Sequence, residues 1–261
     1  MKNAETAQMR KNNLFLLLGG IFLTNAILAE IIGVKIFSME NSLGVSPAQI
    51  PLMQGFTLDF NLSAGVLIWP VVFIVSDLIN EYFGPAGVKK ISYAAVGFIV
   101  YTFLVVYVAT KLAPADFWLQ SNATDAKGNS FNINFAYSTI FTQGLNIMVA
   151  SVTSFLVGQL LDAYIFQALR KASNGRFIWL RATGSTLISQ LVDSFLILTL
   201  AFYLMGNWSI QQVISVGIIQ YLYKLTVAVL LTPVIYVCHA YIDRYLGLKV
   251  AHNMEQNAQN Q

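Results

Sequence analysis

An acidic residue, Asp193, lies inside an apolar stretch that runs from Ala182 to Met205. A charged side chain near the middle of a membrane helix costs about 2.5 to 3.5 kcal/mol on insertion scales, so it normally faces a partner, a cavity or a transport path. Helical steps of four and three residues place Thr186 and Gln190 on the same face as Asp193. The pattern predicts a polar site at mid-depth in a membrane helix.

A basic residue occurs at a matching depth in the next apolar stretch. Lys224 shares a helical stripe with Gln220 and Tyr221. Counted inward from opposite surfaces, Asp193 and Lys224 each lie about half way through their helices, so an ion pair would offset both burial costs. A purely structural salt bridge is the simpler interpretation of this pair. The amides of Gln190 and Gln220 beside this pair favour a binding cavity.

A second polar group is predicted nearer one membrane surface. Asp77, Asn80 and Glu81 share one helical face, and Gln159 and Asp162 lie close together in another helix. We interpret these five residues as a gate or the inner part of a path. Glu81 and Asp162 equally suit ion pairs with basic residues at that surface.

Polar or small residues in two further helices could serve either helix packing or ligand binding. Asn25, in the first apolar stretch, suits an interhelical hydrogen bond as well as a ligand contact. Ser151, Ser154 and Gly158 share a stripe of small residues, which more often marks a helix contact than a ligand site.

The elements that must position these residues are membrane helices. Hydrophobic residues make up 56% of the chain and charged residues only 10%, which is too few to solvate the surface of a soluble domain. Crossing a bilayer takes about 20 apolar residues per helix. Such runs predict an all-α bundle of six spans in a single membrane domain, over 14–34, 62–79, 91–110, 135–169, 182–205 and 210–241.

The basic residues predict the orientation, because cytoplasmic segments are enriched in Lys and Arg. With the N-terminus in the cytoplasm, the outer segments hold only Lys35, Lys111 and Lys127, and Lys224 lies within the sixth span. The other Lys and Arg residues are then cytoplasmic, and six spans return the C-terminus to the same side. We expect the polar tail, residues 252–261, to be frayed.

Other function classes find little support. The lone Cys238 allows no internal disulfide and offers no metal cluster, and His239 and His252 fall at or beyond the predicted cytoplasmic end. The net charge of +3 follows from the cytoplasmic bias and does not indicate nucleic-acid binding. No nucleophile elbow or paired acidic motif indicates an enzyme. A transporter for a small polar solute, without cofactor or metal, fits best.

Several segments together resemble the queuosine precursor transporter family, within the broader vitamin-uptake group. They are TN and KI at 24–25 and 35–36, WP and SDLINEYFG at 69–70 and 76–84, GQLLD at 158–162, WLR and STLISQLVDS at 179–181 and 185–194, and YK at 223–224. The similarity covers nearly all six spans. Glu30 departs from the family pattern, which leaves its role open.

The resemblance implies a six-helix importer of 7-cyano- or 7-aminomethyl-7-deazaguanine in the bacterial inner membrane. One carboxylate can accept both adjacent N–H donors of a deazaguanine, and an ammonium can donate to its carbonyl. We therefore assign Asp193 to the donor edge and Lys224 to the carbonyl. Gln190, Gln220 and Asn25 would complete the hydrogen bonds.

A flat apolar wall for the base is expected from Tyr221 or Trp69. Two rival functions stay open: a substrate-binding subunit of an energy-coupling vitamin transporter, and a membrane enzyme acting on a lipid or isoprenoid. The expected partners are a small-molecule 7-deazapurine and the lipid bilayer, and a small-residue stripe would also suit a homodimer interface.

Overall fold

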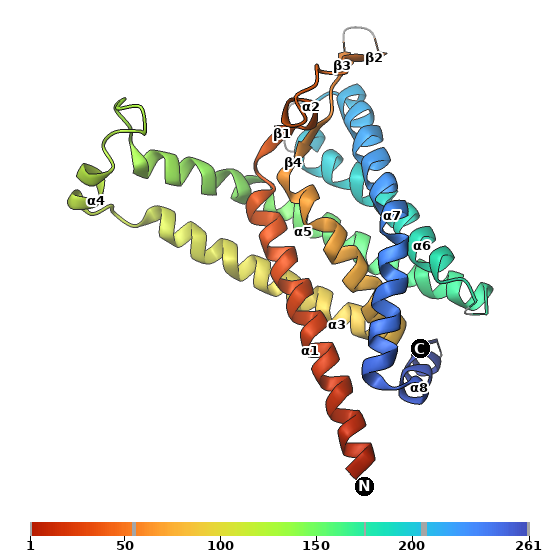
Figure 1. The fold of residues 1–261 in the computed structure, drawn as a ribbon. Coiled ribbons are helices and arrows are strands. Elements are labelled where there is room, and N and C mark those ends of the chain that lie inside the picture. The colour runs from red at the N-terminus through yellow and green to blue at the C-terminus, as the bar shows by residue number, and fades with distance from the viewer. Residues whose placement is uncertain (1, 54–55, 175, 205–207, 260–261) are drawn as a thin grey trace.

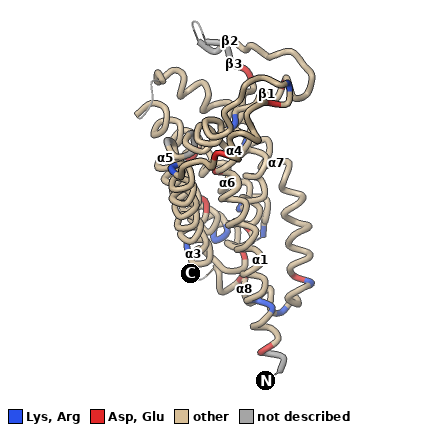
Figure 2. The backbone as a smooth tube through the Cα atoms, turned by 90° about the vertical axis from the view of Figure 1, so that its left-hand side faces the viewer, with Lys and Arg blue, Asp and Glu red and all other residues tan. Residues whose placement is uncertain are grey.

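The computed structural model describes residues 2–53, 56–174, 176–204 and 208–259, and it is built almost entirely from helices. Its long helices are α1 (Lys2–Ile32), α3 (Trp69–Lys111), α5 (Ile133–Ala172), α6 (Ile178–Leu198) and α7 (Ile210–Leu246). Within the described residues five helices are long and apolar enough to cross a membrane, α6 being extended by the π-helical turn η2 (Thr199–Leu204). Figure 2 shows that charged residues are sparse along these helices. The all-α polytopic membrane architecture is confirmed at this level.

The third predicted span and most of the second lie in α3, which breaks sharply at Gly84. Gly84 has φ 70° and ψ −175°, a conformation that is essentially restricted to glycine, and Pro85 begins the next helical segment. The polar stretch between the two predicted spans is therefore helical on both sides of a single residue. The predicted end of the fifth span, Met205, lies outside the described residues.

Residues 62–68, predicted to begin the second span, are not α-helical. They form strand β4 (Asn61–Ser63) and the 3-10 turn η1 (Ala64–Leu67), so α3 begins only at Trp69. Strand β4 pairs antiparallel with β1 (Ile36–Ser38), and β2 (Ile50–Met53) pairs with β3 (Phe56–Leu58). With the short helix α2 (Met39–Ser42), these strands form a cap over one end of the helices (Figure 1). We call it the outer cap, after the side of the membrane predicted for residues 35–61.

Glu40 connects parts of this outer cap by hydrogen bonds. Its carboxylate accepts the backbone N–H of Phe60 at 2.7 Å and the hydroxyl of Ser38 at 3.1 Å. The N–H of Phe60 is the main reason why the pKa of Glu40 lies below its ordinary value. A charged carboxylate therefore links α2 to the residues that lead into β4.

The prediction of a frayed tail over 252–261 is wrong for the part of it that the structure describes. Residues 248–259 form helix α8 (Leu248–Gln259), which follows Gly247 at φ 84°. Ala251, Met254 and Ala258 are buried, and α8 lies against α3. A spacing of three and four residues between apolar side chains gives this polar segment a packing face.

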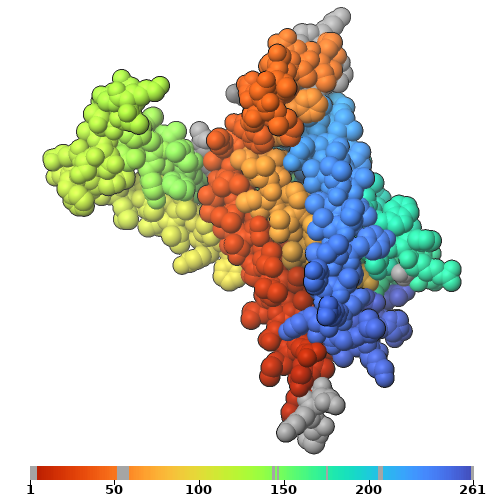
Figure 3. All heavy atoms as spheres, viewed as in Figure 1, coloured from red at the N-terminus to blue at the C-terminus, as the bar shows by residue number. Residues whose placement is uncertain are grey.

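The main hydrophobic core lies where the middle and C-terminal parts of α1 meet α3, and it extends to α5 and α7. Phe22, Val72, Ile79 and Val88 are fully enclosed there. The C-terminal part of α3 and the N-terminal part of α5 leave this body as a hairpin, joined through α4 (Asp116–Ser121) (Figures 1 and 3). Close packing of the body fixes the helices that carry the polar residues.

Candidate functional site

A cavity of about 320 Å³ lies beneath the outer cap. Its walls come from α1, β1, β4, η1, α3, α5, α6, η2 and α7, so most of the chain contributes to it. Ligand pockets typically measure roughly 300 to 1,000 Å³. Most of its lining is apolar, with a few convergent polar side chains, which is typical of a small-molecule site.

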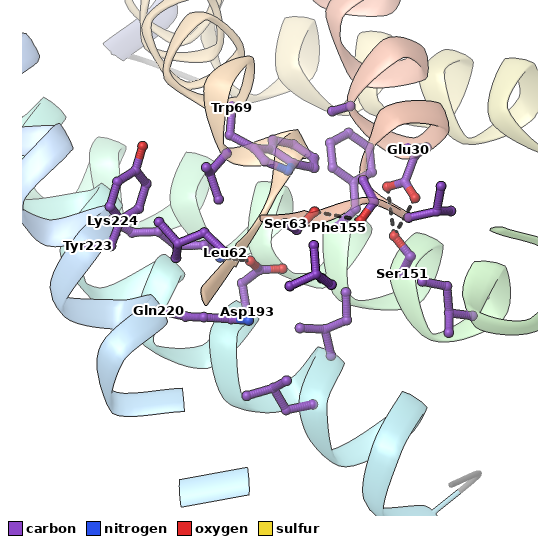
Figure 4. Close-up of a pocket in the computed structure, with 18 of the residues that line it drawn as sticks. Glu30, Leu62, Ser63, Trp69, Ser151, Phe155, Asp193, Gln220, Tyr223 and Lys224 are labelled. Carbon is purple, nitrogen blue, oxygen red and sulfur yellow. Dashed lines mark hydrogen bonds and ion pairs between the residues drawn. The ribbon is translucent and has the colours of Figure 1, made fainter. Parts of the chain in front are cut away.

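The predicted ion pair lies in this cavity (Figure 4). Lys224 Nζ on α7 is 2.5 Å from Asp193 Oδ2 on α6, and the two side chains are 14% and 18% exposed. The pairing predicted from matched depths is thus confirmed. Because neither side chain is fully enclosed, both remain within reach of a molecule that enters the cavity.

The stripe of small residues on α5 supports Asp193 from behind. Ser154 Oγ is 3.1 Å from Asp193 Oδ1 and also 3.1 Å from the Asp193 carbonyl oxygen. A Cβ atom at Gly158 would lie only 3.3 Å from the Cβ of Asp193. Ser154 and Gly158 therefore form a helix contact within this chain, whereas Ser151 of the same stripe lines the cavity.

A second carboxylate, Glu30 of α1, lies on the opposite side of the cavity (Figure 4). The hydroxyl of Ser151 lies 2.7 and 2.6 Å from its two carboxylate oxygens. The sequence interpretation left the role of Glu30 open, because the family resemblance offered no acid at this position. The criterion that identified Asp193, an acid within an apolar run, applies equally to Glu30 and would have found it.

Aromatic rings form one wall between the two carboxylates. Trp69, at the first turn of α3, has its ring centroid 5.6 Å from that of Phe155 and 6.0 Å from that of Phe73. Trp69 lines the cavity, as predicted. The other predicted wall residue, Tyr221, is not among the lining residues, and its near neighbour Tyr223 is.

Of the three amide side chains predicted to bind the ligand, only one lines the cavity. Gln220 lines the cavity next to the ion pair (Figure 4). Asn25 Nδ2 donates to the carbonyl of Ile21 in its own helix at 2.8 Å and lies outside the cavity lining. Gln190 is buried behind the lining, and its Oε1 has no hydrogen-bond partner among the described residues.

The five residues predicted to form a gate or inner path are brought together and buried between α3 and α5. Asn80 Nδ2 donates to the Ala163 carbonyl at 3.2 Å, and Gln159 Oε1 accepts from Ser76 at 2.8 Å. Asp162 accepts from Ser189 at 3.0 Å. The first two bonds join α3 to α5, and the third joins α5 to α6.

Glu81 forms an ion pair with two arginines. Arg181 contacts both of its carboxylate oxygens at 2.8 Å, and Arg170 Nη2 lies 2.9 Å from Oε1. The Glu81 side chain is fully enclosed. The ion-pair reading of Glu81 is therefore confirmed, although the pair is buried and does not lie at a surface.

The described part of this inner cluster is closely packed. A void of only about 10 Å³ borders Asp77, whose Oδ1 has no hydrogen-bond partner among the described residues. No substrate fits in such a space. The 320 Å³ cavity and this void have no lining residue in common.

Comparison with known proteins gives a consistent picture. The model of the family described as "Putative vitamin uptake transporter" matches residues 63–238. A probable queuosine precursor transporter of Bacillus subtilis is 27% identical over 180 residues, which cover 68% of this chain and 72% of the relative.

Two further relatives give similar values. A probable queuosine precursor transporter of Haemophilus influenzae is 26% identical over 66% of each chain. The queuosine precursor transporter of Escherichia coli is 25% identical over 66% of this chain and 70% of its own. No solved structure matches.

Proposed function

This chain belongs to the vitamin uptake transporter family, and we propose that it imports a queuosine precursor, a 7-deazaguanine base, into the bacterial cytoplasm. As a family member it is a membrane transporter and not an enzyme. The observation that carries the substrate assignment is the Asp193–Lys224 pair in a cavity of base-sized dimensions, in a chain whose named relatives transport this class of compound.

The cavity offers complementary groups for such a base. The carboxylate of Asp193 accepts the two adjacent N–H groups of the deazaguanine edge, and Lys224 and Gln220 donate to its carbonyl. Trp69 provides a flat surface for the ring. A hydrogen bond to a charged group contributes about 1.5 to 3 kcal/mol, so loss of the Asp193 charge removes a large share of the affinity.

We assign six spans and a cytoplasmic N- and C-terminus in the inner membrane. The break at Gly84 supports counting α3 as two spans, because each side of it is a separate helical segment. Lys89 and Lys90 follow the break and agree with a cytoplasmic turn there. The outer cap then lies over the cavity on the other side of the membrane.

Within this topology, the buried cluster from Asp77 to Glu81 with Gln159 and Asp162 is the inner gate. In the present conformation this gate is closely packed, because its five side chains are buried and the void beside Asp77 is only about 10 Å³. Release of substrate to the cytoplasm requires α3 and α5 to separate at this level, which breaks the bonds of Asn80 and Gln159.

The test is uptake of labelled precursor by bacteria that lack both its synthesis and its import. Cells expressing this chain alone should accumulate label. Asp193→Asn should lower uptake about 10- to 100-fold at limiting precursor, because one charged hydrogen-bond acceptor is lost. Asp116→Asn, in the exposed helix α4, is the matched control and should transport normally.

The other possible outcomes of this uptake experiment lead to different conclusions. Wild-type uptake only when an ATPase module is supplied would identify a subunit of an energy-coupling transporter. No uptake of any precursor, with the protein shown to be in the membrane, would refute the proposed function. Unchanged uptake by Asp193→Asn would refute the site.

A further inference from the structure

The cavity has two polar ends with different charge. Asp193, Lys224 and Gln220 lie on one side, and Glu30 with Ser151 on the other (Figure 4). Lys224 balances the charge of Asp193. Among the residues described as lining the cavity there is no second cation, so Glu30 adds a carboxylate without an opposite charge.

The hydrogen bonds of Glu30 leave room for a donor from a ligand. A carboxylate offers about four lone-pair positions, and the hydroxyl of Ser151 has a single proton to give. The two short contacts from Ser151 Oγ therefore share one hydrogen between the two oxygens of Glu30. About two acceptor positions remain, and they belong to a side chain that lines the cavity.

An unpaired charge in such a place is costly unless its partner arrives with the ligand. Ser151 is only 7% exposed, and Glu30 borders the apolar surfaces of Trp69 and Phe155 in the same cavity. Burial of a carboxylate without an opposite charge is unfavourable. The arrangement is complementary to a ligand that carries an amide edge at one end and an ammonium at the other.

We infer that Glu30 is the specificity-determining residue for a cationic substrate, so that this chain prefers the aminomethyl precursor to the cyano precursor. This inference rests on the proposed function. A primary alkyl amine, like that of lysine, is protonated at neutral pH and brings three N–H donors. A nitrile has no donor and no charge, so it leaves the carboxylate of Glu30 unpaired and desolvated.

The wild-type protein alone provides the first test. Uptake of labelled cyano precursor is competed by unlabelled 7-aminomethyl-7-deazaguanine and by its 7-hydroxymethyl analogue, which has nearly the same size and no charge. We expect the amine to inhibit at a concentration at least about tenfold lower than the hydroxymethyl analogue. Equal inhibition by the two compounds would overturn the inference.

The second test is the Glu30→Gln variant, which keeps the size of the side chain and its ability to accept from Ser151. The ratio of uptake efficiencies, aminomethyl over cyano, should fall at least about tenfold relative to wild type. Asp116→Asn, which makes the same acid-to-amide change at an exposed position of α4, is the matched control. Its ratio should stay within about threefold of wild type, a change of less than 1 kcal/mol.

Failure of this inference and failure of the proposed function give different results. If wild-type cells take up neither precursor, the function itself is wrong. If they take up both and Glu30→Gln lowers both equally, Glu30 supports the fold or the transport cycle and does not select the substrate. The competition assay with wild type remains decisive if the variant is poorly expressed.

Discussion

At the scale of single residues, Asp193 and Lys224 stabilise one another as well as forming the site. Lys224→Met removes the cation and leaves Asp193 charged and largely buried. We expect a loss of about 3 kcal/mol in stability, the lower end of the range for a broken buried pair, because both side chains keep some exposure. The measurement is thermal unfolding in detergent.

The double variant Asp193→Asn with Lys224→Met separates the two roles. It has no unpaired charge, so most of the lost stability should return while uptake stays at least about tenfold below wild type. A double variant as unstable as Lys224→Met would show that the pair does not account for the effect.

Glu81 should be far more important for stability than for substrate affinity. Glu81→Gln leaves Arg170 and Arg181 buried without their carboxylate, and a broken pair of this kind costs about 3 to 5 kcal/mol. We expect a large drop in the yield of folded protein and in its unfolding temperature. Asp116→Asn, which changes an exposed acid to its amide in the same way, should leave both unchanged.

At the scale of helices, the break in α3 depends on one residue. Gly84→Ala places a Cβ in a conformation that side chains rarely adopt, at a cost of about 1 to 3 kcal/mol. Gly97→Ala, in the C-terminal segment of the same helix, meets no atom within 4 Å and should be neutral or slightly stabilising. Comparison of unfolding temperatures tests this, and equal effects of the two substitutions would contradict a strained break.

At the scale of the whole molecule, the prediction concerns the two faces of the membrane. In a Cys238→Ser background, Lys127→Cys tests the loop after α4 and Lys249→Cys tests the start of α8; both side chains are exposed. An impermeant maleimide should label position 127 in intact cells and position 249 only after the cells are opened. Labelling at 249 in intact cells would rule out a cytoplasmic C-terminus.

Much of the site followed from the sequence because membrane helices obey simple rules. An acid or base within an apolar run is conspicuous, and the 3.6-residue period shows which residues share its face. This reasoning identified Asp193, Lys224, Gln220 and the inner cluster. Depth in the membrane was enough to predict the Asp193–Lys224 pair, since both positions can be counted from the ends of their helices.

Some parts of the fold could not be predicted from hydropathy and helical period. The strands of the outer cap are only three or four residues long and depend on pairing between distant segments. The packing of α8 also depends on a surface of α3 that exists only in the folded bundle. Local patterns do not encode such contacts.

By itself the sequence determined the membrane class, the apolar helices and the set of polar side chains within them, because hydropathy and helical period are local properties. Only the tertiary structure decided which polar residues share one cavity. It brought Glu30 to the site and left Asn25 outside. The reason is physical: the rotation of each helix about its axis is set by packing against its neighbours, and that rotation decides which face meets the cavity.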